Sequence, residues 1–148
     1  MAHFEIIVGS VLGATEYVAD AVLETLEKCG MQGTIHLTPT LGEIDASRPW
    51  IICTSTHGAG DLPDNIQPFA DALANASLNT TRFLVIGLGD SSYDTYCFGA
   101  MKMQSLCEAQ GATLLAPPLH IDVLNHPIPE EIAAPWLEKQ ISAQYLEA

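Results

Sequence analysis

The chain has 148 residues, 48% of them hydrophobic, which is enough to bury the core of one ordinary domain. Five Lys and Arg residues against 18 Asp and Glu residues give a net charge of −13, which excludes nucleic acid as an expected partner because binding it requires cations. No apolar run approaches the ~20 residues that span a bilayer, so a membrane protein is not expected.

Apolar strands and helical patterns alternate along the whole chain. Strands are predicted, in chain order, at residues 4–8, 34–37, 50–54, 83–86 and 113–121. Helices are predicted between Thr15 and Gly30 and at residues 66–78, 97–110 and 130–146. This order predicts an α/β fold with a doubly wound, five-stranded parallel sheet and helices on both faces, as a single domain over residues 1–148.

The residue patterns inside these elements support the same fold. The third and fourth strands are apolar throughout, as strands buried on both faces are. Pro117 and Pro118 should weaken the first half of the fifth strand or force it to an edge. The predicted buried stripes of the helices are Val18, Val22, Leu23 and Leu26 in the first, Phe69, Leu73 and Leu78 in the second, and Trp136, Leu137, Ile141 and Tyr145 in the last.

In such a sheet a ligand binds at the carboxyl ends of the strands, where the strand order reverses. The loop after the first strand, residues 9–16, leads into a helix whose free N–H groups and dipole attract an anion. Ser10 and Thr15 add hydroxyl donors, and Gly13 lets the backbone approach a ligand. The loop lacks both the Gly-Lys-Ser/Thr and the G-x-G-x-x-G patterns, so a phosphate here would rely on neutral donors. An ordinary capped helix start is the alternative.

The loops after the third and fourth strands, residues 55–65 and 87–97, combine glycines with aromatic and small polar residues. Gly58 and Gly60 allow positive φ and close approach to a planar ligand. Tyr93 stands among small polar residues, as stacking on a flat heteroaromatic ring requires. Each loop alone could be an ordinary sheet turn, but three such loops at the three relevant strand ends favour one ligand site.

The cysteines argue against metal and dithiol chemistry. Cys29, Cys53, Cys97 and Cys107 lie far apart without a C-x-x-C pair, and the five histidines are scattered. We therefore expect no metal site. Free thiols, together with a first segment unlike a signal peptide, favour the cytoplasm.

On the segments 10–16, 55–65 and 87–97 the chain resembles the flavodoxin family, in particular its short-chain MioC type, and also the FMN domains of diflavin reductases. The resemblance covers essentially the full length. It implies a sheet of strand order 2-1-3-4-5 that binds one FMN without a covalent bond. Two departures would loosen FMN: Leu12 stands where the family usually has a hydroxyl residue, and His57 where Trp or Tyr often covers the flavin.

The resemblance also implies a role for each site residue. The phosphate would lie among Ser10, Val11, Leu12, Gly13, Ala14 and Thr15, with Leu12 giving only its N–H. Tyr93 would lie flat on one face of the isoalloxazine ring and His57 near the other. The remaining implied cofactor contacts are Ser55, Thr56, Gly58, Ala59, Gly60, Gly87, Leu88, Gly89, Asp90, Tyr96, Cys97 and Asp122.

The implied function is electron transport by one-electron steps, between a donor like flavodoxin reductase and a metalloenzyme or radical-enzyme acceptor. The acidic surface would steer partners with a basic face, although it could equally serve solubility alone. Two alternatives stay open: an FMN-dependent NAD(P)H reductase of a small molecule, and a flavin-free interaction protein on the same fold. Arg48 and Arg82, the only arginines, lie outside the flavin loops. We expect a monomer or weak dimer, and more a carrier than an enzyme.

Overall fold

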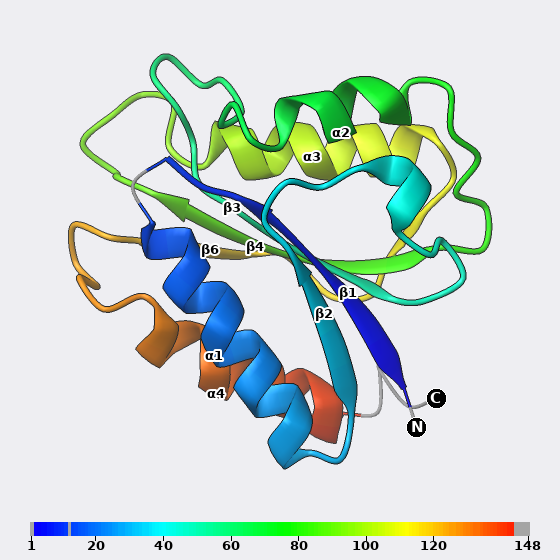
Figure 1. Ribbon diagram of the computed structural model, residues 1–148. Coiled ribbons are helices and arrows are strands. Elements are labelled where there is room, and N and C mark those ends of the chain that lie inside the picture. The colour runs from blue at the N-terminus through cyan, green and yellow to red at the C-terminus, as the bar shows by residue number, and fades with distance from the viewer. Residues whose placement is uncertain (1, 12, 144–148) are drawn as a thin grey trace.

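A computed structural model describes residues 2–11 and 13–143 of the chain. Figure 1 shows a twisted central sheet with α1 and α4 on one face and α2 and α3 on the other. The elements are β1 (His3–Gly9), α1 (Ala14–Lys28), β2 (Gln32–His36), the 3-10 helix η1 (Leu41–Glu43), β3 (Trp50–Thr54), α2 (Gln67–Leu73), β4 (Arg82–Gly89), α3 (Phe98–Ala109), β5 (Thr113–Leu114), β6 (Leu119–Asp122) and α4 (Glu130–Ser142).

The sheet is parallel throughout and has the order β2-β1-β3-β4-β5, which confirms the predicted fold class. The predicted fifth strand is divided, because β5 pairs with the start of β4 and β6 pairs with its end. Pro117 and Pro118 lie in the interruption, where the missing N–H donors of proline prevent a continuous ladder. The sheet therefore has six strands in five positions.

Helix α2 is shorter than predicted, and the predicted buried stripe of α4 is buried only in part. Helix α2 ends at Leu73, whereas the prediction continued to Leu78. Leu78 is nevertheless buried, and its N–H donates to the Gln110 carbonyl oxygen at 2.9 Å, so a loop rather than a helix brings it into the core. In α4, Leu137 is fully buried while Trp136 and Ile141 are partly buried; the predicted contribution of Tyr145 lies outside the described residues.

The core forms two layers because successive residues of a strand point to opposite faces of the sheet. On one face Phe4, Ile6 and Val8 of β1 belong to a cluster that includes residues of α1 and α4. On the other face Ile7 and Ile52 belong to a cluster with residues of α2 and α3. Both faces are covered, which explains why β3 and β4 have unbroken runs of apolar residues.

Helix α3 lies very close to β4 at one point. A Cβ atom added to Gly87 would lie 2.5 Å from the Cβ of Ala100, which is too close for any side chain. Gly99, one residue earlier on α3, is similarly close to the Ser55 carbonyl oxygen, at 2.6 Å from its added Cβ. These small residues set the position of α3, and thus of the loop that precedes it.

Candidate functional site

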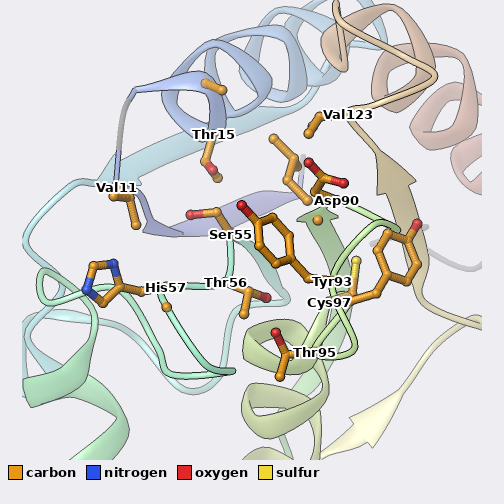
Figure 2. A pocket seen from close by; sticks show the side chains of 15 residues that line it. Val11, Thr15, Ser55, Thr56, His57, Asp90, Tyr93, Thr95, Cys97 and Val123 are labelled. Carbon is orange, nitrogen blue, oxygen red and sulfur yellow. The ribbon is translucent and has the colours of Figure 1, made fainter.

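The carboxyl ends of β1, β3 and β4 meet at one cavity of about 370 Å³ (Figure 2). All three loops that the sequence singled out contribute to its wall. The lining residues are Val11, Ala14, Thr15, Ser55, Thr56, His57, Gly58, Leu88, Gly89, Asp90, Tyr93, Thr95, Tyr96, Cys97 and Val123.

The first loop offers donors to an anion at the start of α1. Gly13 has φ 91° and is the N-cap residue of the helix, without a side-chain cap. The Gly13 N–H donates to the Ser10 Oγ at 3.0 Å, so the hydroxyl hydrogen of Ser10 stays free to donate. The amides of Ala14 and Thr15 have no acceptor among the described residues. These neutral donors, together with the helix dipole, suit a phosphate; Leu12 lies outside the described residues.

The second loop is a tight hairpin at the edge of the cavity. The His57 N–H donates to the Asp61 carbonyl oxygen at 2.7 Å, and the Asp61 N–H donates back at 2.8 Å. Gly58 at the hairpin tip has φ 54°, and Gly60 has φ 100°, so both adopt the left-handed region that favours glycine. The His57 side chain is exposed, and Figure 2 shows it beside Val11 at one side of the cavity.

The third loop presents Tyr93 on a turn built around Asp90. The Ser92 N–H and Oγ both donate to Asp90 Oδ1, at 2.9 and 2.6 Å, and the Tyr93 N–H donates to the Asp90 carbonyl oxygen at 3.1 Å. The Tyr93 side chain is 64% exposed although it lines the cavity. The turn thus fixes the backbone at Tyr93, and the exposed ring is free to stack on a ligand.

Cys97 and Tyr96 form a protonated part of the wall. Burial, helped by the charge of Asp122, raises the pKa of the Cys97 thiol to about 11. Burial and the neighbouring Cys97 raise the pKa of Tyr96 to about 12. Cys97 also has φ 55°, which is unusual for a residue with a side chain. Neither group ionises near neutral pH, so neither serves there as a base or nucleophile.

Several predicted contacts lie outside the cavity wall. Gly87 packs against Ala100 in α3, and Gly60 is buried with its α-carbon facing Phe98. Ser10, Gly13 and Ala59 belong to the bordering loops without lining the cavity themselves.

Asp122 is also outside the wall, and its carboxylate is hydrogen-bonded to other residues. It accepts hydrogen bonds from Ser91 N–H and Oγ, from the Leu124 N–H at 3.1 Å and from Asn125 Nδ2 at 2.9 Å. The hydrogen bond from Ser91 lowers the pKa of Asp122 below its ordinary value. Asp122 thus anchors the beginning of the third loop to the turn after β6.

Three residues of the site region were not predicted from the sequence: Thr95, Val123 and Asn65. Thr95 lies within the 87–97 motif, and Val123 directly follows Asp122, so adjacency to predicted residues was the available signal for both. The Val123 N–H donates to the Gly89 carbonyl oxygen at 2.8 Å, which holds it against the third loop. Asn65 ends the second loop and contacts the first through its side chain.

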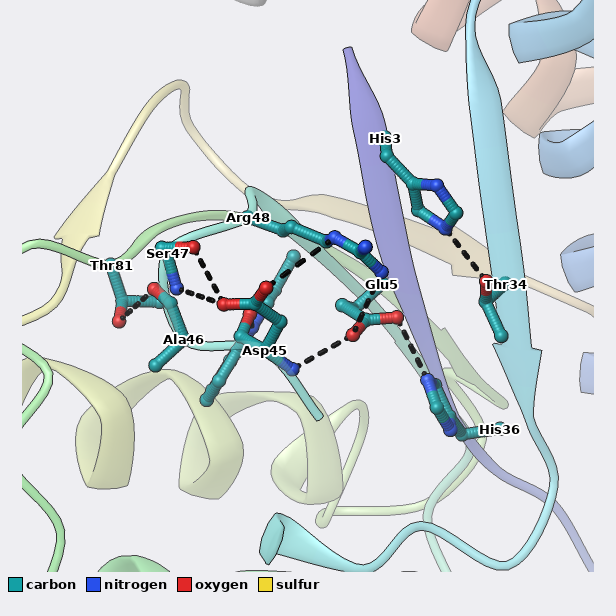
Figure 3. A network of polar contacts seen from close by, with 10 residues as sticks. His3, Glu5, Thr34, His36, Asp45, Ala46, Ser47, Arg48 and Thr81 are labelled. Carbon is teal, nitrogen blue, oxygen red and sulfur yellow. Dashed lines mark hydrogen bonds and ion pairs between the residues drawn. The ribbon is translucent and has the colours of Figure 1, made fainter. Parts of the chain in front are cut away.

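The cations of the chain lie away from the cavity wall, whose described residues include neither Lys nor Arg. Arg48 lies 3.7 Å from Glu5 Oε2 and 3.6 Å from Asp45 Oδ2 (Figure 3). Glu5, only 2% exposed, also accepts from the Asp45 N–H at 2.8 Å and lies 2.9 Å from His36 Nε2. Glu5 pairs with Trp50 at the amino end of β3, so this network is remote from the ligand loops. Lys102 lies 3.6 Å from Asp61.

The strand order reverses between β1 and β3, and the cavity lies at that reversal. A sheet of order 2-1-3-4-5 with a cavity at its switch point, beside the start of α1, places the chain among the doubly wound α/β proteins that bind a ligand at the carboxyl ends of their strands. The chain belongs to the flavodoxin family, whose family model matches residues 6–136.

Similar sequences and solved structures agree with this family assignment. The chain is 42% identical over 137 residues to the protein MioC homolog of Haemophilus influenzae, covering 91% of this chain and 94% of that one. It is 41% identical over 139 residues to the protein MioC of Escherichia coli strain K12, covering 93% and 95%. A cysteine-to-serine mutant of a flavodoxin from Pseudomonas aeruginosa superposes with a TM-score of 0.89 at 33% identity, covering 99% of both chains.

Membership of this family implies FMN as the cofactor and electron transfer as the general activity. The described residues fit the group: neutral donors at the start of α1 suit its phosphate, and the exposed Tyr93 ring suits its flat ring system. Within the part of the chain that the structure describes, no helix is both long and apolar enough to cross a membrane.

Proposed function

We propose that this chain carries electrons in one-electron steps between separate proteins, with FMN held in the 370 Å³ cavity. The main support for the proposal is that the N-terminus of α1, which can bind an anion, and the exposed Tyr93 ring lie on the wall of the same cavity. FMN supplies the redox chemistry when it is bound, and the protein binds, orients and tunes it.

The first loop binds the phosphate in this proposal. The Ala14 and Thr15 amides and the hydroxyls of Ser10 and Thr15 donate to it, and the α1 dipole adds a favourable field. Because the lining offers no Lys or Arg among the described residues, the phosphate is recognised by geometry rather than by a counter-charge.

The second and third loops hold the ring. Tyr93 stacks on one face and His57 lies near the other, while Thr56, Gly58 and Ala59 border the N5 edge. Gly58, at φ 54° and exposed, leaves its peptide able to turn its carbonyl towards that edge, which a residue with a Cβ would resist. Gly89, Asp90 and Cys97 approach the ring and ribityl chain from the other side. The protonated Cys97 and Tyr96 contribute no charge there near neutral pH.

The partners in this proposal are a donor like flavodoxin reductase and a metalloenzyme or radical-enzyme acceptor in the cytoplasm. Glu16, Asp61, Asp64 and Asp94 are exposed on the loops around the cavity and in the first turn of α1. They attract a basic docking face, and salt screens this attraction over about 10 Å at 0.1 M. Electron transfer from a basic reductase should therefore slow as ionic strength rises; faster transfer at high salt would argue against this docking surface.

Titration of the apoprotein with FMN tests the proposal. Binding should quench flavin fluorescence at stoichiometric ligand, and stepwise reduction followed by visible absorption should show two separate one-electron stages. Absence of quenching would instead support a flavin-free interaction protein. Rapid bleaching by NADPH alone, without an added reductase, would support the alternative of a small-molecule reductase.

A further inference from the structure

The side chain of Asn65 joins three separate segments at the carboxyl edge of the sheet. Its Nδ2 donates to the Val8 carbonyl oxygen at 2.8 Å and to the Leu37 carbonyl oxygen at 2.9 Å. Its Oδ1 accepts the Ser10 N–H at 2.9 Å. Val8 is in β1, Ser10 begins the phosphate loop and Leu37 directly follows β2.

These partners fix the orientation of the amide and require asparagine. Both hydrogens of Nδ2 point to carbonyl oxygens, and Oδ1 faces an N–H; a flipped amide would place like groups together at all three contacts. Aspartate could accept from Ser10 but could not donate to either carbonyl. Serine or alanine would be too short to reach all three segments.

The bond from Asn65 determines which Ser10 group is available to a ligand. With its N–H bound to Asn65, Ser10 is held where its Oγ accepts the Gly13 N–H at 3.0 Å. The Ser10 hydroxyl hydrogen is then the free donor of this residue. One side chain from the second loop thus shapes the first loop without lining the cavity.

We infer that Asn65 is a positioning residue for the phosphate of FMN: it sets the phosphate loop before the ligand arrives. This rests on the proposed function, because it requires FMN in the cavity. Preorganised donors spare the ligand the cost of ordering the loop, and the benefit is confined to the ligand group that the loop contacts. Asn65 should therefore affect recognition of the phosphate and leave recognition of the ring unchanged.

A comparison of FMN with riboflavin, which has the same ring and no phosphate, separates positioning from general destabilisation. In the full chain, Asn65→Ala should weaken FMN binding about tenfold, the equivalent of one hydrogen bond to a charged group. Riboflavin affinity should stay within about twofold. Asn75→Ala is the matched control: Asn75 is exposed, follows α2 and makes no side-chain hydrogen bond among the described residues. This control should change neither affinity.

Equal weakening of both ligands by Asn65→Ala, or no weakening of either, would overturn the inference. Failure of the wild-type chain to bind FMN would instead refute the proposed function. Amide hydrogen exchange of the apoprotein tests separately whether Asn65 sets the first loop: the Ser10 N–H should exchange faster in Asn65→Ala than in wild type, and an unchanged rate overturns the inference whatever the outcome for FMN. If Asn65→Ala does not fold, Asn65→Gln replaces it in the ligand comparison, since it keeps a neutral amide but displaces it by one methylene group from its three partners; FMN should again lose more affinity than riboflavin, and equal loss of both ligands would again refute positioning.

Discussion

Replacing Gly87 with alanine distinguishes two reasons why this position requires glycine: close contact with the flavin, or close contact with helix α3. The added Cβ would lie 2.5 Å from the Cβ of Ala100 and 3.3 Å from His120 Cδ2. The first distance is far inside van der Waals contact, and both Gly87 and Ala100 are buried. Helix α3 must therefore move away from β4 or the variant must be strained.

The expected cost is that of overpacking a full core, about 1–3 kcal/mol. For a chain of this size each kcal/mol lowers the melting temperature by about 2–4 °C, so Gly87→Ala should melt roughly 2–12 °C lower. Ala100→Gly alone should cost about 1 kcal/mol through helix propensity, and a further ~0.8 kcal/mol for the lost methyl group. In the double variant the clash is absent, so its destabilisation should be smaller than the sum by at least ~0.5 kcal/mol.

Urea unfolding of the apoproteins, followed by circular dichroism, measures the four free energies of this cycle. Gly42→Ala is the control for a glycine replacement, since a Cβ there meets no atom within 4 Å; it should not destabilise the protein. FMN affinity should show the same non-additivity as stability, so the double variant should lose less affinity than the two single variants together. Additive losses of affinity beside non-additive free energies of unfolding would show that Gly87 contacts the flavin, and additive free energies of unfolding would refute the packing explanation itself.

Three further perturbations test other parts of the structure. Tyr93→Ala should weaken FMN binding by about 1 kcal/mol, roughly fivefold, through lost stacking; the urea midpoint of the apoprotein should not move, because the ring is 64% exposed. Glu5→Ala should lower the free energy of unfolding by about 2–4 kcal/mol, since it leaves His36 and the Asp45 N–H without their buried acceptor; FMN affinity should be retained, and its loss would show coupling between the two ends of the sheet. In native protein at about pH 8, only the exposed Cys29 should react quickly with an aromatic disulfide reagent. Burial raises the pKa of Cys53 and Cys107 to about 12 and of Cys97 to about 11, from an ordinary value of 9.0. Thiols in the unfolded chain ionise before the buried thiols of the folded chain, so the stability that these three groups give should be full below pH 9 and decline as pH rises towards 12; a flat profile over this range would contradict the burial of the three thiols.

The order of elements and the position of the site were predictable from the sequence, because both follow from patterns along the chain. Unbroken apolar runs such as 50–54 identify strands buried on both faces, and ligand loops follow from the direction of parallel strands. Because these runs are apolar on both faces, they do not indicate which residue faces which helix. Gly87 and Gly89 look equivalent in sequence, yet only Gly89 lines the cavity while Gly87 faces Ala100.

The contacts that the sequence did not reveal depend on residues far apart in the chain. Asp122 lies beside the site, but its carboxylate accepts hydrogen bonds from Ser91, Leu124 and Asn125 instead of facing the cavity. Asn65 reaches Leu37, 28 residues earlier, and Val8, 57 residues earlier. No periodicity or motif reports such a bond, because it forms only after the sheet has brought the segments together.

The interruption between β5 and β6 affects how readily the protein aggregates at high concentration. These two short strands form one outer border of the sheet, and Pro117 and Pro118 sit where the ladder breaks. An uninterrupted edge strand would expose a row of unpaired N–H and C=O groups. A strand of a neighbouring molecule could pair with this row, which is the first step towards fibrils. The break shortens that row to a few groups at either end, so this side of the protein resists growth into larger aggregates.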